Sequence, residues 1–169
     1  MEQKRVFSLL VDNTSSVLSR VSGLFTRRGY NIHSISAGTT MDPRFTRITV
    51  VVDGDDLIFE QIEKQMRKMV DVIDVKTLKE GVSVCRELIM IKIRASAEDR
   101  QAILSVVDIF RAKVVDVGID SMIIELTGSP KKIDGFMGML EEYDIIEVSR
   151  TGVTGMARDS SEEKHLTGI

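Results

Sequence analysis

Several residue types that serve catalysis, base stacking or covalent cross-linking are scarce in this chain of 169 residues. Tryptophan is absent and aromatic residues make up only 5%, so platforms that stack nucleic-acid bases are not expected. The single cysteine, Cys85, excludes an intramolecular disulfide framework and fits a reducing compartment. The two histidines, His33 and His165, leave few candidate catalytic bases.

Charge and hydropathy patterns argue against two further classes of partner. Acidic and basic residues are intermixed at a net charge of −3, which gives no basic footprint for nucleic acid. No run approaches the ~20 apolar residues that a membrane-spanning helix needs, and the start of the chain is too polar for a signal peptide. We therefore expect a cytoplasmic protein with neither a nucleic-acid nor a membrane partner.

The spacing of apolar residues divides the chain into two copies of one pattern. Short apolar or alternating runs predict strands, and apolar spacings of three and four predict amphipathic helices. Strands are expected over 5–11, 31–39, 45–52, 70–78, 84–95, 113–117, 121–127 and 145–148, and helices over 16–29, 55–69, 102–110 and 130–140. Each copy therefore runs strand, helix, strand, strand, helix, strand.

This repeated order predicts an α+β fold with two ferredoxin-like βαββαβ sandwiches in tandem. In each, two helices would cover one face of a four-stranded antiparallel sheet. The expected domains are 1–79 and 80–158, followed by a polar tail over 159–169. Because each copy is small for a core of its own and leaves a sheet face and edges uncovered, we expect self-association.

The sequence does not predict a catalytic or metal site. The motifs HExxH, CxxC, GxSxG, GxGxxG and GxxxxGK[ST] do not occur, and the carboxylates are scattered over helix surfaces. A small hydrolase of the acylphosphatase type is one alternative, but it needs an arginine-bearing phosphate loop that DNTSSVLSR lacks. An RNA-binding ferredoxin-like domain is disfavoured by the net charge and the missing aromatic pattern.

The polar turn over 12–16 is the strongest candidate for a binding site, because backbone N–H groups are free at the start of a helix. The plainer alternative is that Asp12 to Ser16 only cap that helix. An α-amino acid would need N–H donors for its carboxylate, acceptors for its ammonium and an apolar slot. The amides after the turn, two asparagine carbonyl oxygens and nearby aliphatic side chains offer these, with Asn31 approaching the turn in a dimer. The candidate residues are Asn13, Ser16, Val17, Leu18, Asn31 and Ile32.

The ordered segments LVDNTSSVLSRVSGLFTRRGYNIHSISAG, DPRFTRITVVVDGDD, FEQIEKQMRKMVDVIDV, RELIMIKI, IFRAKVVDV and EVSRTGVTGMAR resemble a known family. They are similar to the small regulatory subunit of acetohydroxyacid (acetolactate) synthase, whose amino-terminal part is an ACT domain. The resemblance covers roughly residues 4–158. The first segment alone is typical of any ACT domain that binds amino acids, and the set as a whole is much more specific.

The resemblance implies a subunit that makes no product itself. Such a subunit activates a large catalytic subunit, which carries the cofactors thiamine diphosphate, magnesium and FAD, and confers feedback inhibition by valine or a related branched-chain amino acid. The effector lies between the ACT domains of a homodimer, at positions that match the six candidate residues. An ACT-type amino-acid sensor that regulates a different enzyme remains an alternative.

Two local features refine this expectation. The family usually has glycine where this chain has Ser16, which leaves the affinity for the effector and its identity open. The corresponding turn of the second copy, over 96–99, is acidic and lacks asparagine. We therefore expect one effector site, in the first copy only.

Overall fold

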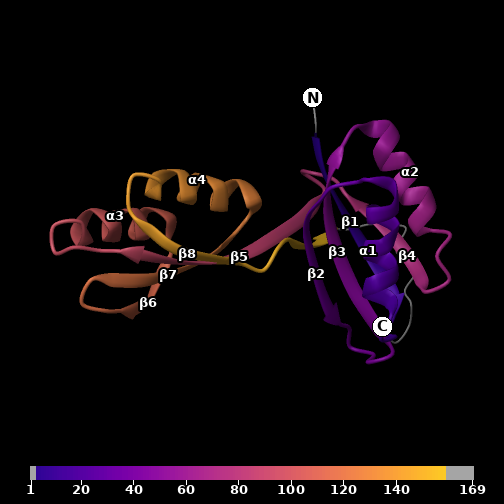
Figure 1. Ribbon diagram of the computed structural model, residues 1–169, viewed down its shortest axis with the longest axis horizontal. Coiled ribbons are helices and arrows are strands. Elements are labelled where there is room, and N and C mark those ends of the chain that lie inside the picture. The colour runs from indigo at the N-terminus through magenta and orange to yellow at the C-terminus, as the bar shows by residue number, and fades with distance from the viewer. Residues whose placement is uncertain (1–2, 159–169) are drawn as a thin grey trace. The chain divides into compact units, whose positions relative to one another are not determined.

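The computed structural model describes residues 3–158, which fold into two compact units (Figure 1). The first unit runs to Val84 and resumes at Val153, and the second is Cys85–Gly152. The stretch 80–158, expected as a second domain, thus contributes residues to both units. The expected polar tail over 159–169 lies outside the described residues.

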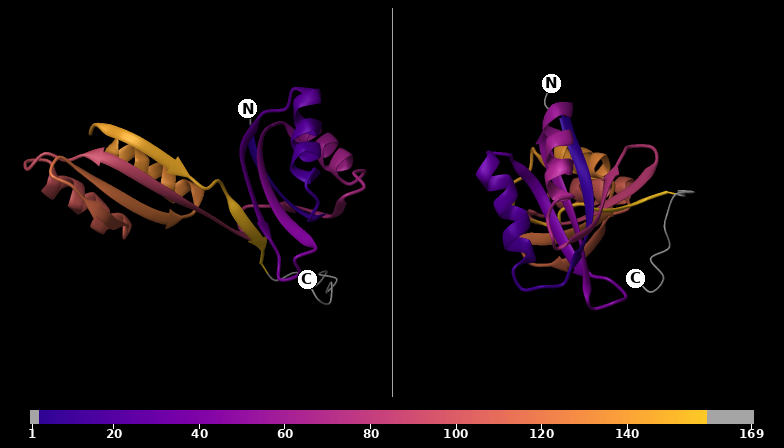
Figure 2. Two further views of the ribbon diagram at one scale, coloured as in Figure 1. Left: turned by 60° about the horizontal axis from the view of Figure 1, so that its bottom comes forward. Right: turned by 90° about the vertical axis from the view of Figure 1, so that its right-hand side faces the viewer.

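The first unit is a four-stranded antiparallel sheet with two helices on one face (Figure 2). Its elements are β1 (Gln3–Asp12), α1 (Val17–Arg28), β2 (Ile32–Thr39), β3 (Phe45–Gly54), α2 (Asp56–Met66) and β4 (Val72–Leu78), and its strand order is β2-β3-β1-β4. Apolar side chains from one face of the sheet meet those of both helices. The buried core includes Phe7, Leu9, Val11, Val21, Phe25, Ile48, Val50, Phe59 and Ile62.

The second unit repeats this arrangement, with both helices on the same side of its sheet (Figure 1). Its elements are β5 (Ser83–Arg94), which begins two residues before this unit, α3 (Arg100–Phe110), β6 (Lys113–Val117), β7 (Ser121–Gly128), α4 (Pro130–Leu140) and β8 (Ile145–Arg150), with the strands in the order β6-β7-β5-β8. Its core includes Ile89, Ile91, Ile93, Ile103, Val107, Ile124, Ile133 and Phe136. The prediction of two tandem ferredoxin-like sandwiches is confirmed.

The ends of α1 and α2 test the local signals predicted from the sequence. Helix α1 stops at Gly29, whose φ of 67° is left-handed and favours glycine. The Asp55 side chain caps α2 by accepting from the Ile58 N–H at 2.8 Å. The expected extension of α2 to Met69 is wrong, because the Met69 N–H bonds back only three residues, to Met66. The chain therefore leaves the helix in a tight turn while Met69 still packs on the core.

A short strand that the sequence did not predict, β9 (Thr154–Ala157), pairs with β5. Just before it, Val153 lies on the helix-free face of the first sheet. The Val153 carbonyl accepts from the Ser36 hydroxyl at 3.0 Å, and the Val153 N–H donates to the Ser34 hydroxyl at 3.5 Å. Side chains on this face, Leu10 and Thr49 among them, are buried. The expectation that this face is uncovered is therefore wrong for the first unit.

A buried ion pair joins two strands of the second unit. Glu87 in β5 is 4% exposed, and both of its carboxylate oxygens accept from the Arg150 guanidinium of β8, at 2.7 and 2.8 Å. The bidentate pairing raises the pKa of Arg150. This contact places the Arg150 of the SRTG segment within the second unit.

Candidate functional site

The turn between β1 and α1 is held by two neighbouring loops. The Asp12 N–H donates to the Asp71 carbonyl at 2.9 Å, and the Asn13 N–H donates to the Arg44 carbonyl at 2.7 Å. The side chain of Arg20, one turn into α1, donates to the Asp71 carboxylate at 2.5 Å. These contacts fix the direction in which the first turn of α1 points.

The first turn of α1 presents unused backbone donors. The amides of Ser15, Ser16, Leu18 and Ser19 find no acceptor within residues 3–158. Ser16 occupies the N-cap position but makes no side-chain capping bond, and no acidic residue lies in the first turn. The Ser16 side chain therefore does not cap the helix, although capping was the plainer of the two alternatives that the sequence left open. Free N–H groups and the helix dipole favour an anion at this point.

Serine at position 16 is compatible with the backbone of the turn. Its φ of −103° and ψ of −2° lie in a region that non-glycine residues adopt. With this helical ψ, its hydroxyl accepts no hydrogen bond from the amides two or three residues ahead, since N-cap residues that do so usually have extended φ and ψ. The serine at this position thus leaves the amides free.

Asn13 is locked in the turn by its own side chain. Its Nδ2 donates to the Pro43 carbonyl at 2.8 Å, and its Oδ1 accepts from the Thr46 hydroxyl at 3.0 Å. Thr46 is 7% exposed, so this bond is sheltered from water. Both ends of the Asn13 amide therefore hold the turn in place.

The aliphatic candidate residues differ in what they expose. Val17 is buried in the core of the first unit, and the half-buried Ile32 packs against that core. Leu18 is 46% exposed and lies beside the free amides. Leu18 is therefore the candidate side chain that offers the most apolar surface next to these donors.

Asn31 and Ile32 lie at the opposite end of the sheet from the turn. Strand β3 spans ten residues, or about 30 Å at ~3.3 Å per residue. Asn13 contacts the start of this strand through Thr46, whereas Asn31 contacts its end, with Nδ2 donating to the Asp53 carboxylate at 2.9 Å. Within one chain, the turn and Asn31 are too far apart to share one small ligand.

Thr46, Asp53 and Asp71 hold candidate residues or the turn that carries them, and no sequence pattern selects these three residues. Each lies far along the chain from the residue it contacts, and none belongs to a recognisable motif. Arg20 pairs with Asp71, whose side chain is 14% exposed. Only the strand pairing brings these residues together.

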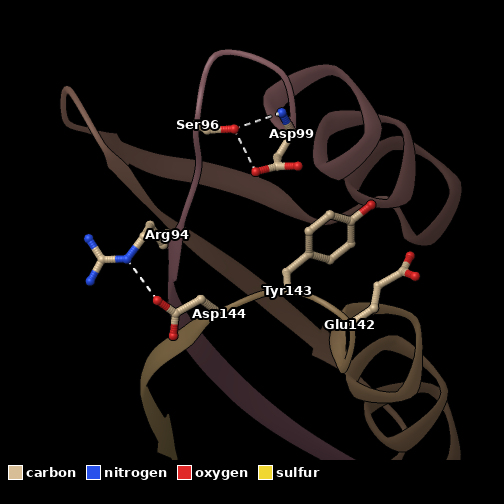
Figure 3. A pocket seen from close by; sticks show the side chains of 6 residues that line it. All are labelled: Arg94, Ser96, Asp99, Glu142, Tyr143 and Asp144. Atoms are coloured by element: carbon tan, nitrogen blue, oxygen red, sulfur yellow. Dashed lines mark hydrogen bonds and ion pairs between the residues drawn. The ribbon is translucent and has the colours of Figure 1, made fainter.

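The corresponding turn of the second unit lines a pocket with different chemistry (Figure 3). Its volume is about 410 Å³, and Arg94, Ser96, Asp99, Glu142, Tyr143 and Asp144 line it. The Arg94 N–H donates to the Asp144 carbonyl at 2.9 Å, as Asp12 does to Asp71 in the first unit. The Asp99 carboxylate accepts from the Ser96 hydroxyl at 2.6 Å, and the Asp144 carboxylate, which accepts from the Arg94 side chain at 2.7 Å, raises the pKa of that arginine. Carboxylates line this pocket, whereas no acidic residue lies in the first turn of α1.

Residues 3–158 contain no cluster of three or more histidine, cysteine, aspartate or glutamate residues that could hold a metal ion. Across the same residues, no helix is both long and apolar enough to cross a membrane. Tandem ferredoxin-like βαββαβ units of this kind place the chain in the class of proteins built from ACT-like domains.

Comparisons with known proteins name the family. A profile described as an AHAS small subunit-like ACT domain matches residues 7–74, and one described as the small subunit of acetolactate synthase matches residues 86–159. The chain belongs to the acetolactate synthase small subunit family, in which catalysis is carried out by a separate large subunit.

Relatives match nearly the whole chain. The probable acetolactate synthase small subunit of Methanothermobacter thermautotrophicus is 44% identical over 92% of this chain and 93% of its own length. The isozyme 3 small subunit of Escherichia coli is 41% identical over 92% of this chain and 96% of its own length. The crystal structure of the Thermotoga maritima small subunit superposes with a TM-score of 0.84 at 39% identity, covering 94% of this chain and 99% of that one.

Proposed function

We propose that this chain mediates feedback inhibition of acetolactate synthase by binding valine, or a related branched-chain amino acid, between the first units of a homodimer. The observation that carries the proposal is the first turn of α1, where the amides of Ser15, Ser16, Leu18 and Ser19 have no acceptor within residues 3–158. Such donors suit the carboxylate of an amino acid.

A two-fold pairing would complete the site. Strand β2 is an edge of the first sheet, and Ile35 on it is 39% exposed. Helix α1 runs from the free amides toward Asn31, which follows Gly29 and Tyr30. When two copies pair antiparallel through β2, the start of α1 in one copy lies near Asn31 of the other. Each dimer would then contain two equivalent sites.

The protein groups that bind the ligand come from both chains of the dimer. One chain supplies the free amides for the carboxylate, with Asn13 holding the turn and Ser16 adding a hydroxyl. The exposed Leu18 forms part of an apolar slot for a branched side chain. The other chain supplies Asn31 as the acceptor for the ammonium, and Ile32 beside it extends the slot. Val17 supports the first turn of α1 from the core.

Regulation requires that the effector binds two states of the complex with unequal affinity. The partner is the large catalytic subunit, which carries thiamine diphosphate, magnesium and FAD and acts in the cytoplasm. The small subunit raises its activity, and the bound amino acid reverses that activation. A sensor that serves a different enzyme would bind the amino acid but leave this activity unchanged.

Reconstitution of the two subunits tests the proposal. Acetolactate formation by the cognate large subunit is measured alone, with this chain, and with this chain plus valine. We expect activation by the chain and inhibition by valine, with one valine bound per chain in calorimetry. Valine binding without any effect on acetolactate formation would favour the sensor alternative, and absence of both effects would contradict the proposal.

A further inference from the structure

The side chain of Asn31 is oriented by an acidic neighbour at the end of β3. Its Nδ2 donates to Asp53 Oδ2 at 2.9 Å, and its backbone carbonyl accepts from the Asp53 N–H at 3.4 Å. The Asp53 side chain is 20% exposed, so the contact is largely sheltered. Asn31 and Asp53 are therefore joined through both side chain and backbone.

The chemistry of the pair fixes which way the Asn31 amide points. A carboxylate only accepts hydrogen bonds, so the NH₂ group must face Asp53 and the carbonyl oxygen must face away. Asn31 is exposed, and its Oδ1 has no hydrogen-bond partner among residues 3–158. The result is a free acceptor held in a fixed direction, with a negative charge behind it.

Two nearby groups leave this pairing intact. His33 Nδ1 lies 4.0 Å from the same Asp53 oxygen, beyond hydrogen-bond distance. On its other side, His33 Nε2 lies 3.1 Å from Lys4 Nζ. Asn31 is consequently the side-chain hydrogen-bond partner of Asp53 within the described part of the chain.

We propose that Asp53 is a positioning residue that sets the polarity of the effector site, making it select α-amino acids over carboxylic acids that lack the amino group. The inference rests on the proposed function. The free amides of one chain take the carboxylate, so the remaining charged group of the ligand is an ammonium. A carbonyl oxygen accepts from an ammonium, whereas an NH₂ group in its place would repel it.

Asn13 does not offer a free carbonyl oxygen to the ammonium of the ligand. Its Oδ1 already accepts from Thr46, and its Nδ2 already donates to the Pro43 carbonyl. Of the two asparagines, Asn31 is the one whose carbonyl oxygen is unengaged within residues 3–158. The direction of the Asn31 carbonyl oxygen therefore depends on Asp53, which lies next to the last residue of β3 and belongs to no motif that would identify it from sequence.

The test compares valine with 3-methylbutanoate, which has the same carbon skeleton and carboxylate but no ammonium. Calorimetric affinities for both ligands are measured on the full-length wild type, on Asp53→Ala and on Asp56→Ala. Asp56→Ala is the matched control, because it removes a carboxylate nearby that pairs with Arg5 and does not bond Asn31. Thermal unfolding confirms that each variant is folded.

We expect Asp53→Ala to weaken valine binding about tenfold, as for one lost charge-assisted hydrogen bond, and to leave 3-methylbutanoate binding unchanged. Asp56→Ala should leave the ratio of the two affinities as in the wild type. The double variant Asn31→Asp with Asp53→Asn should restore the preference for valine, since the exchanged pair again presents an oxygen outward.

If Asp53→Ala weakened the binding of valine and of 3-methylbutanoate equally, Asp53 would have a merely structural role and the inference would be overturned. Unchanged valine binding in that variant would overturn it as well. Failure of the wild type to bind valine, leucine or isoleucine is a separate result, because it would contradict the proposed function itself.

Discussion

Replacing Ser16 with aspartate should weaken effector binding strongly without destabilising the protein. The substitution places a carboxylate beside the free amides of Ser15, Leu18 and Ser19, where it competes with the carboxylate of the ligand and repels it. A negative charge at a helix N-terminus is stabilising by about 0.5 kcal/mol. Stability and binding should therefore change in opposite directions, which nonspecific damage to the fold would not produce.

The magnitudes follow from the contacts that change. Loss of a charge-assisted carboxylate–amide interaction costs about 1.5 to 3 kcal/mol, which weakens valine binding at least about tenfold. The gain at the helix start raises the Tm by about 1 to 2 °C for a chain of this length. The α1 backbone at position 16 is already compatible with a side chain, so no strain offsets this gain.

Calorimetry with valine and thermal unfolding by circular dichroism measure the two effects. Ser129→Asp is the matched control, because it makes the same replacement at the N-cap of α4, where the Ser129 hydroxyl already accepts from the Lys132 N–H at 3.3 Å. That variant should bind valine as the wild type does. Wild-type affinity in Ser16→Asp would refute the assignment of these amides to the ligand carboxylate.

Two further predictions concern the second unit. Arg150→Ala leaves the buried Glu87 carboxylate unpaired. We expect the free energy of unfolding, measured in urea, to fall by about 2 to 3 kcal/mol. This is less than the ~3–5 kcal/mol lost when a fully buried pair is broken, because the arginine is partly exposed. A loss of stability no larger than that caused by Arg94→Ala, which breaks the exposed pair with Asp144, would contradict this reasoning. Burial raises the pKa of the Cys85 thiol, so iodoacetamide should modify it several-fold more slowly at pH 8 than in the urea-unfolded chain. Equal rates would show that the thiol is not shielded.

The sequence predicted the elements whose signals are local. Helix α1 was identified by its apolar stripe and by Gly29, and α4 by Pro130, because caps and periodicity depend on neighbouring residues. Strand β9 was missed because it is four residues long and pairs with a strand about 70 positions earlier. A short strand of this kind forms only in the presence of its partner.

The candidate site was predictable only in part. The free amides followed from a strand-to-helix turn, but the engagement of Asn13 by Thr46 and of Asn31 by Asp53 depends on the register of β3 against β1 and β2. Sequence reasoning treated the two asparagines as equivalent acceptors. The hydrogen bonds distinguish them, since Asn13 holds the turn and Asn31 presents a free oxygen.

The central claim is that each effector site is built from two chains, and hybrid dimers test it most directly. Ser16→Asp and Asn31→Ala are prepared separately, each expected to bind no valine at the concentrations used. Mixing and subunit exchange should produce hybrid dimers in which one site carries both substitutions and the other carries neither. We predict that valine binding reappears at one site per hybrid dimer. Hybrids that remain unable to bind would contradict a shared site and place both residues in a pocket within one chain.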